Sequence, residues 1–409
     1  MNERLAARPR PRNRRWTRPM PLRDHTVAHR PSTPLELLFD LCFVVSAAVL
    51  ADQLSASVVN GHPLTGAIRY TLLFMPVWWT WMLFTWFGTA FDNDDVPYRL
   101  LTLAQMAGAL GIAASMPSAF QGNYTPLTWA FTVARVPLII AWLRGARHYP
   151  AERTFSMRYA VGVAGCTVLW VVLLLAPTPA RYAGYVIVMV LELSVPRWAV
   201  AAANRQCFHV GHITERYGLF TLLVLGESIL AATLALQESF SVGITPGLLV
   251  IGASALVSAF SVWWLYFDFV DGRALMLNNR AAFQWGYGHL LVFASIGAMG
   301  AGAQVAVLAY EHHHFDLAAQ LAMGLPTAAC IAAMAQIRRL SVGSAWYMTV
   351  GRACSALLVV VAATVAGQAG PAATAAAAAG ILVTQAAAET LWYGLRTHTT
   401  DPIPANSTS

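Results

Sequence analysis

Several carboxylic acids stand inside long apolar runs of this sequence, and four of them are candidates for a functional site. Glu36 and Asp40 lie in the first apolar run, Glu192 in a middle run and Glu227 in a later one. An ionisable side chain at membrane depth is costly, and it usually faces a bundle interior or a water-filled cavity. These four acids are therefore the predicted site for a substrate, an ion or a proton.

Each acid also has a structural interpretation. A buried carboxylate can pair with an arginine, and Arg135 and Arg352 are intramembrane cations that could neutralise such acids. Glu36 has a further alternative, because Thr33-Pro34-Leu35-Glu36 fits a capping box with proline at the first helical position. Asp40 follows Glu36 by one helical turn and lies on the same helix face. For Asp40, both a functional site and a structural ion pair stay open as interpretations.

Glu227 has no capping role available. It lies about 18 Å further along a helix than Glu215, at ~1.5 Å per residue. That depth is near the middle of a bilayer. Glu227 is therefore the leading candidate among the four acids, against the alternative of a satisfied buried pair.

The sequence predicts no metal, no cofactor and no enzymatic activity. Cys207, His209, His212 and Glu215 offer thiolate and imidazole ligands, but they lack the paired spacing of structural zinc sites. All 26 basic residues counted as lysine plus arginine are arginine. Mechanisms that need a lysine, such as a phosphate loop or a Schiff base, are therefore excluded.

The elements that must position these acids are membrane-spanning helices. Hydrophobic residues make up 57% of the 409 residues and charged residues only 11%, where soluble proteins carry about 25% charged residues. Runs of roughly 20 apolar residues recur almost to the end of the chain. We predict an all-α polytopic membrane bundle of about twelve transmembrane helices. The predicted spans are Pro34–Leu54, Leu64–Gly88, Tyr98–Met116, Leu127–Leu143, Tyr159–Leu175, Tyr182–Val195, Ile213–Leu236, Pro246–Phe269, Phe283–Leu308, Leu317–Ile337, Ser344–Gly367 and Ala372–Leu391.

Composition divides the chain into a membrane domain and two tails. Residues 1–31 are rich in arginine and proline, and they have too little apolar surface to fold alone. We expect a disordered cytoplasmic tail there, attracted to anionic lipid headgroups. Residues 32–395 form the predicted transmembrane domain, and residues 396–409 a short cytoplasmic tail.

The distribution of arginine predicts the orientation. With residues 1–31 in the cytoplasm, the predicted outer loops contain Arg181 alone among the arginines, and the inner loops contain the rest of the loop arginines. This is the positive-inside bias of a cytoplasmic-membrane protein with both termini in the cytoplasm.

Two tryptophan pairs suggest an internal repeat. Trp78-Trp79 and a later Asp92 resemble Trp263-Trp264 followed by Asp268. Six spans in each of the halves 32–200 and 205–395 would give a parallel 6+6 repeat of the kind found in transporters. The alternative is that tryptophans gather at membrane interfaces in any case.

Three motifs together resemble the bacterial low temperature requirement A (LtrA) family. They are residues 29–44 (HRPSTPLELLFDLCFV), residues 212–220 (HITERYGLF) running into 225–229 (LGESI), and residues 263–268 (WWLYFD). The motif residues of chemical interest are His212, Glu215, Arg216, Trp263, Trp264 and Asp268. Leu38 stands where the family more often has phenylalanine. The resemblance implies a polytopic bacterial membrane protein associated with growth in the cold, and it supplies no substrate.

The leading functional hypothesis is a permease-like transporter of a small solute or ion. Two alternatives stay open, a cation channel and a non-transporting membrane protein that supports growth in the cold. The expected partners are the lipid bilayer and an unidentified small solute or ion, without nucleic acid. The sequence is also compatible with a homo-oligomer.

Overall fold

The apolar runs form long helices. The computed structural model describes residues 16–20, 32–91, 93–203, 208–241, 243, 245–270, 272–342 and 346–400. Side chains are not described at positions 178, 179, 227, 235, 238, 239, 341, 342 and 393–400. Within these limits the long helices are α1 (Pro34–Val59), α2 (Pro63–Ala90), α3 (Val96–Phe120), α4 (Thr125–His148), α5 (Arg153–Val172), α6 (Thr178–Val200), α7 (Val210–Ser241), α8 (Pro246–Phe269), α10 (Asn279–Glu311), α11 (Leu317–Val342), α12 (Trp346–Ala366) and α13 (Pro371–Thr400). The short elements are α9 (Ala274–Leu277) and the 3-10 turns η1 (Pro150–Glu152), η2 (Leu173–Leu175) and η3 (Gly367–Ala369).

The all-helical membrane fold predicted from the sequence is confirmed. Each predicted span corresponds to one long helix, and 11 helical segments in the described part of the chain are long and apolar enough to cross a membrane. The helix outside this set is α2, whose interior carries several tryptophans, residues that count as nearly neutral in hydropathy. Of the predicted tail 1–31, only residues 16–20 are described.

Helix ends differ from the prediction where polar residues cap them. We expected the ninth span to begin at Phe283, but α10 begins at Asn279 because the Asn278 side chain accepts a hydrogen bond from Ala281 N. At α1 the predicted capping box is confirmed. Thr33 N donates to Glu36 Oε2 at 2.7 Å, and Glu36 N donates to Thr33 Oγ1 at 3.3 Å.

Contacts divide the chain into two units. Among the described residues, one unit contains 16–20, 86–108 and 132–208 without the gaps given above, and the other contains those within 32–85, 109–131 and 209–400. The first unit therefore includes α5 and α6, and the second includes α1 and α7 to α13. Because α2, α3 and α4 contribute to both, the units cut across the halves 32–200 and 205–395. The 6+6 repeat stays a prediction.

Aromatic rings fill the core of the first unit. The ring of Trp142 stacks on Tyr159, with centroids 4.2 Å apart, and meets Phe87 edge-on at 5.0 Å. Phe155 packs edge-on against both Trp142 and Tyr159. Edge-on and stacked aromatic pairs stabilise such a core beyond the area that they bury.

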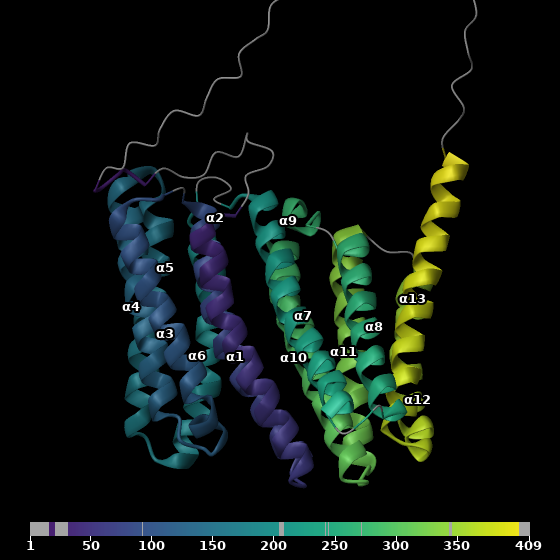
Figure 1. Ribbon diagram of the computed structural model, residues 1–409. Coiled ribbons are helices and arrows are strands. Elements are labelled where there is room, and N and C mark those ends of the chain that lie inside the picture. Colours follow the sequence, from purple (N-terminus) through teal and green to yellow (C-terminus); the bar gives the residue numbers. More distant parts are fainter. Residues whose placement is uncertain are drawn as a thin grey trace, which may run out of the picture. The chain divides into compact units, whose positions relative to one another are not determined.

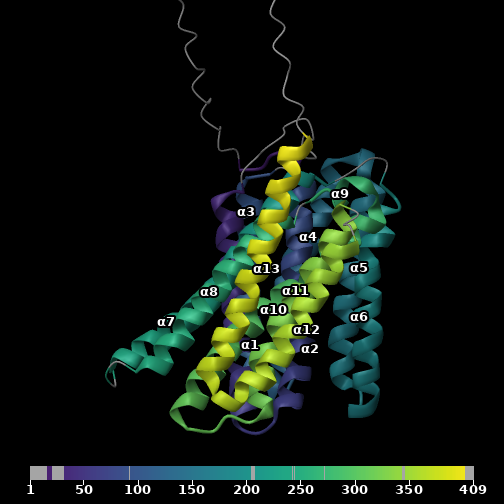
Figure 2. The same ribbon diagram turned by 90° about the vertical axis from the view of Figure 1, so that its right-hand side faces the viewer.

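In the second unit, α10 packs against α1, α7, α8, α11 and α13, and Figure 2 shows it among α8, α11 and α13. Small residues allow this close packing. At Gly297 of α10 a Cβ atom would lie 2.7 Å from the hydroxyl of Tyr70, which donates to Ala294 O at 2.7 Å. Glycine at this position therefore leaves room for the Tyr70 hydroxyl of α2 to donate a hydrogen bond to the backbone of α10.

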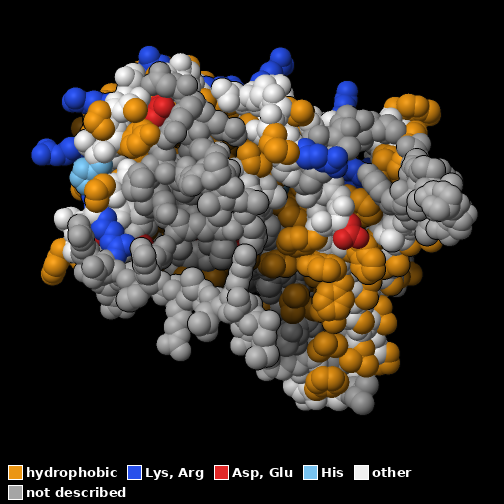
Figure 3. Space-filling model, turned by 90° about the horizontal axis from the view of Figure 1, so that it is seen from above, with side chains coloured by type: hydrophobic (Ala, Val, Ile, Leu, Met, Phe, Trp, Pro, Cys, Tyr) orange, Lys and Arg blue, Asp and Glu red, His pale blue; other side chains and the backbone are white. Residues whose placement is uncertain are grey.

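Helices α1 and α7 start at the same end of the second unit, and α13 finishes there (Figure 1). Helices α2 to α6 lie between α1 and α7 in the chain. If each of them crosses the membrane once, the number of crossings is odd and α1 and α7 must run in the same direction. Among the coloured side chains in Figure 3, blue arginines outnumber the red acids. The assignment of this end to the cytoplasm stays a prediction from the positive-inside rule.

The approach of α3 to α4 at Gly108 gives a stability test. A Cβ atom at Gly108 would lie 2.4 Å from the backbone nitrogen of Ala134. We expect Gly108→Ala to lower the free energy of unfolding by about 1–3 kcal/mol because the helices must separate. The measurement is the Tm of the detergent-solubilised full chain. In the control Gly165→Ala, on α5, the new methyl group meets nothing within 4 Å and should leave Tm unchanged or raise it. Equal losses in both variants would contradict the close-packing explanation.

Candidate functional site

Acidic side chains of α1 meet basic side chains of α7 in the interior of the second unit. Arg216 Nη2 donates to Asp40 Oδ1 at 2.6 Å, and both side chains are 0% exposed. One turn nearer the helix starts, His212 Nε2 lies 3.3 Å from Glu36 Oε1. The two pairs are four residues apart on each helix, so α1 and α7 run in register and one face of each carries the charges.

A third contact joins the start of α1 to α7. The backbone nitrogen of Ser32 donates to Glu215 Oε1 at 2.8 Å. The first two motifs, which lie more than 170 residues apart in the chain, therefore meet as one structure. We call Glu36, Asp40, His212, Glu215 and Arg216 the α1–α7 charge ladder.

Aromatic side chains enclose the Asp40–Arg216 pair. Trp81 Nε1 donates to Asp40 Oδ1 at 2.7 Å, so this oxygen accepts from both α2 and α7. The guanidinium carbon of Arg216 lies 5.8 Å from the centre of the Phe84 ring, and Trp81 stacks on Phe220 at 4.3 Å. In such an apolar surrounding a charge interaction is stronger than in water, and an unpaired charge is more costly.

The bonding of this pair is incomplete. Arg216 Nη2 lies 3.4 Å from Thr85 Oγ1, but Arg216 Nε and Nη1 are buried without a hydrogen-bond partner among the described residues. Asp40 Oδ2 is likewise buried without a hydrogen-bond partner among the described residues. A buried polar atom left unsatisfied costs about 1–3 kcal/mol. The hydrogen-bonding capacity of these three atoms is therefore unused among the described residues.

Two further buried acids, Glu192 and Glu389, have both carboxylate oxygens bonded. In the first unit, Glu192 accepts from both Nη1 and Nη2 of Arg135, the latter at 2.7 Å. In the second unit, Glu389 accepts from Arg338 at 2.6 Å, from Arg352 Nε at 2.6 Å and from Gln385 at 2.6 Å. Arg135 and Arg352, the cations that the sequence suggested, thus pair with Glu192 and Glu389. The partner of Asp40 is Arg216, which the sequence offered only as a motif residue. The shared four-residue spacing of 36/40 and 212/216 was the available signal for this pairing.

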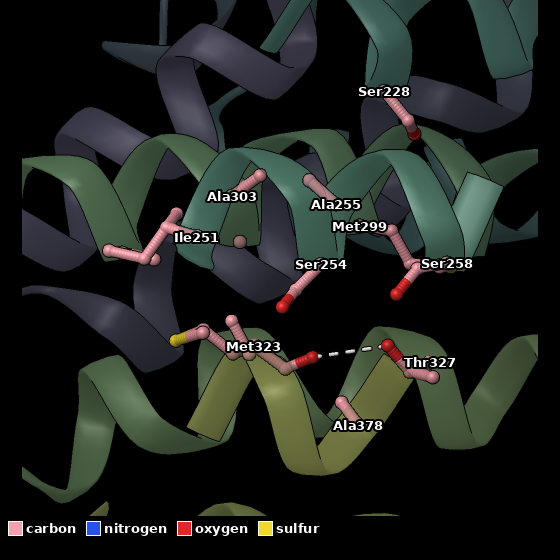
Figure 4. Close-up of a pocket in the computed structure, with 13 residues that line it drawn as sticks. Ser228, Ile251, Ser254, Ala255, Ser258, Met299, Ala303, Met323, Thr327 and Ala378 are labelled. Atoms are coloured by element: carbon pink, nitrogen blue, oxygen red, sulfur yellow. Dashed lines mark hydrogen bonds between the residues drawn. The ribbon is translucent and has the colours of Figure 1, made fainter. Parts of the chain in front are cut away.

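The side chain of Glu227 lies outside the described residues, and its role stays a prediction. Its neighbour Ser228 lines a cavity of about 50 Å³ among α7, α8, α10, α11 and α13. In Figure 4 the hydroxyls of Ser254 and Ser258 on α8 point across this space toward α11, where Thr327 donates to Met323 O at 3.2 Å. The lining is mainly apolar but includes the hydroxyls of Ser228, Ser254, Ser258 and Thr327, and the cavity has room for a few water molecules.

The third motif places its two tryptophans on the surface of α8. Trp263 and Trp264 of α8 are 44% and 45% exposed, whereas Trp78 and Trp79 of α2 are buried. Asp268 is exposed, and Asp92, its predicted counterpart in the repeat, lies outside the described residues. Trp264 Nε1 donates to Thr390 Oγ1 of α13 at 3.1 Å. The two tryptophan pairs therefore occupy different environments.

Within the described residues, no group of three or more histidine, cysteine, aspartate or glutamate side chains could hold a metal ion. Cys207, a member of the cluster weighed above, lies outside those residues. His209 Nδ1 accepts from the backbone nitrogen of His212 at 3.1 Å, so this ring shapes the start of α7.

The sequence matches the family described as bacterial low temperature requirement A protein over residues 31–386. The chain belongs to the LtrA family. The resemblance predicted from the three motifs is thereby confirmed, and the matched region contains the whole α1–α7 charge ladder. The uncharacterized protein RA0937 of Rhizobium meliloti (strain 1021) is 26% identical over 295 residues, which cover 67% of this chain and 70% of that relative. This LtrA protein is a multi-pass membrane protein of a bacterial family.

One acid of this LtrA protein is held outside the membrane spans. Asp95, just before α3, accepts from the guanidinium of Arg144, from Arg18 N at 2.8 Å and from Tyr98 N at 3.0 Å. Burial by itself raises the pKa of Asp95, but the hydrogen bonds from these groups and the charge of Arg144 outweigh it and leave the pKa below its ordinary value. Asp95 therefore ties residues 16–20 to α3 and α4 as an ionised carboxylate.

The lowered pKa of Asp95 predicts a pH dependence of stability. An acid with a lower pKa in the folded state stabilises the fold above its unfolded pKa, about 3.9, and loses that effect as pH falls through the folded pKa. Asp95→Asn should therefore cost about 1.5–3 kcal/mol near neutral pH, measured as Tm in detergent. The difference from wild type should persist down to about pH 5 and shrink below about pH 4.

Asp94→Asn is the matched control. Asp94 pairs with Arg99, whose side chain is 44% exposed, and such surface pairs contribute less than about 1 kcal/mol. If the Tm difference between wild type and Asp95→Asn were as large at pH 3 as at pH 7, this would contradict the role of Asp95 as an ionised carboxylate.

Proposed function

We propose that this LtrA protein is a permease-like transporter of a small solute or ion, in which the Asp40–Arg216 pair changes its bonding during transport. The supporting observation is that Asp40 is fully buried and that one of its carboxylate oxygens, Oδ2, has no hydrogen-bond partner among the described residues. Ionisable groups inside membrane spans are costly and typically mark solute or ion pathways. A carboxylate that served packing alone would be expected to be bonded as fully as Glu192 or Glu389.

The unpaired atoms define what the pair can do. Asp40 Oδ2 can accept a proton or contact a cation, and Arg216 Nε and Nη1 can donate to water or to an anionic group. Because Arg216 and Trp81 share Asp40 Oδ1, a proton or cation on Asp40 weakens the bonds of α1 to both α7 and α2. A bond that depends on occupancy in this way can couple binding to helix movement.

Further polar groups follow the pair along α7. Glu227 is about 17 Å beyond Arg216 at ~1.5 Å per residue, and the cavity at Ser228 lies at the same level. We propose these groups as the continuation of the pathway, with Glu227 as the deeper ionisable site.

A non-transporting structural role is the second candidate, because Glu192 and Glu389 are sealed against arginines. Such pairs hold helices together without chemistry. Under this alternative the protein supports the membrane in the cold, as the name of its family suggests.

Flux measurements on the purified full chain in liposomes test the proposal. We would record pyranine fluorescence and solid-supported-membrane currents after jumps in pH, NaCl, KCl and a pool of small bacterial metabolites. We expect a saturable, pH-dependent flux that Asp40→Asn reduces at least tenfold and Asp40→Glu partly restores. Asp52→Asn is the control, since Asp52 is an exposed acid of the same helix and should keep the wild-type rate.

The contrary outcomes are distinct. A flux that Asp40→Asn leaves intact would contradict the site. Unitary currents in planar bilayers would support a cation channel instead. Folded wild-type protein that shows no flux after any of the jumps would favour the non-transporting role.

A further inference from the structure

Four hydroxyl side chains line the cavity among α7, α8, α10, α11 and α13. They are those of Ser228, Ser254, Ser258 and Thr327. Ser228 Oγ donates to Ile296 O at 3.4 Å, and Thr327 Oγ1 donates to a backbone oxygen of its own helix at 3.2 Å. The oxygens of these two hydroxyls can still accept a hydrogen bond from a molecule in the cavity.

The two serines of α8 keep their full hydrogen-bonding capacity. A serine inside a helix often donates to the carbonyl oxygen four residues earlier, as Ser261 Oγ does to Val257 O at 2.8 Å on the same helix. Ser254 and Ser258 have no side-chain hydrogen bond among the described residues, and their hydroxyls point into the cavity (Figure 4). Ser254 is only 8% exposed. A buried hydroxyl without a partner is costly, so a ligand that bonds to it in the cavity is stabilised.

The lining also restricts the charge of a ligand. Apart from the four hydroxyl side chains, the described lining consists of alanine, glycine, isoleucine and methionine. An ion that enters such a cavity loses its hydration and meets no counter-charge, which costs far more than burying an uncharged polar group. The described lining therefore favours an uncharged ligand over a cation or an anion.

The apolar walls favour a ligand that contains carbon. A buried water typically makes about three hydrogen bonds, and the side chains of Met299, Met323 and Ala378 offer weak acceptors or none. Carbon atoms of a ligand gain from contact with these walls. The volume of about 50 Å³ is well below the ~150 Å³ of an apolar cavity that accepts benzene, so the ligand is smaller than benzene.

We infer that this cavity binds a small uncharged alcohol of the short-chain diol class, with its hydroxyls at Ser254 and Ser258 and its carbon atoms against Met299 and Met323. The two serines are ~6 Å apart along α8 at ~1.5 Å per residue. With hydrogen bonds of about 2.8 Å, the two ends of a short diol can each reach one of them. The inference goes beyond the proposed transport, because binding at equilibrium requires no flux.

Methionine-methyl NMR of the full chain in lipid nanodiscs tests the inference. Met299 and Met323 line the cavity, whereas Met75 and Met82 are buried on α2 and serve as internal controls. The ligands are ethylene glycol, ethanolammonium and glycolate, which are similar in size and are neutral, positive and negative. Ethylene glycol should shift the Met299 and Met323 signals saturably and leave the Met75 and Met82 signals unchanged. The two ions should bind at least tenfold more weakly.

Two substitutions separate the role of the hydroxyls from that of the volume. Ser254→Ala removes a hydroxyl with little change of volume, and it should weaken the binding of ethylene glycol about fivefold, as expected for one lost hydrogen bond. Ala378→Leu fills the cavity and should abolish the saturable shifts. The controls are Ser261→Ala, whose hydroxyl bonds within α8, and Ala376→Leu, at an exposed position of α13. Both controls should bind ethylene glycol as wild type does.

Several results would overturn the inference. If ethylene glycol gives no saturable shift in wild type, the cavity holds water only. If ethanolammonium or glycolate binds as tightly as ethylene glycol, the ligand is not selected for lack of charge. Unchanged binding by Ser254→Ala, or equal weakening by Ser261→Ala, would contradict the role of the cavity hydroxyls. Wild-type signals of Met75 and Met82 in each variant show that the variant is folded.

Discussion

The ion pair between Asp40 and Arg216 constrains the second unit more than any other contact described above. Both groups are fully buried, and separating them would leave two charges in an apolar interior at a cost of several kcal/mol each. The pair therefore fixes the register of α1 against α7. A slip of one turn would bring Arg216 to Glu36 and leave Asp40 without a cation, so the four-residue spacing permits one alignment.

The hydrogen bonding of Asp40 differs from that of two other buried acids, Glu192 and Glu389. Glu192 and Glu389 have their carboxylate oxygens bonded to arginine. Asp40 instead concentrates two donors on one oxygen and leaves the other oxygen without a described partner. All three acids lie in helices that are long and apolar enough to cross a membrane, and the number of bonded carboxylate oxygens distinguishes them.

The features that could be predicted from the sequence are those that depend on neighbouring residues in the chain. Apolar length predicted the twelve long helices, and Thr33 with Glu36 predicted the capping box, because both are properties of neighbouring residues. The pairing of Asp40 with Arg216 could not be predicted in the same way, since it depends on which helices become neighbours in space.

The same limit explains the two tryptophan pairs. Trp78 and Trp263 stand in similar sequence surroundings, yet Trp78 is buried and Trp263 is half exposed, because at that position α2 is covered by other helices and α8 is not.

Glu36 serves two partners with one carboxylate. Its Oε2 accepts from Thr33 N and Thr33 Oγ1 within α1 and lies 3.4 Å from His212 Nε2 of α7. The first turn of α1 therefore cannot fray without disturbing α7, and α7 cannot tilt away without uncapping α1. The two helix ends open and close as a single cooperative element, so amide hydrogens at both should exchange with solvent at a common rate.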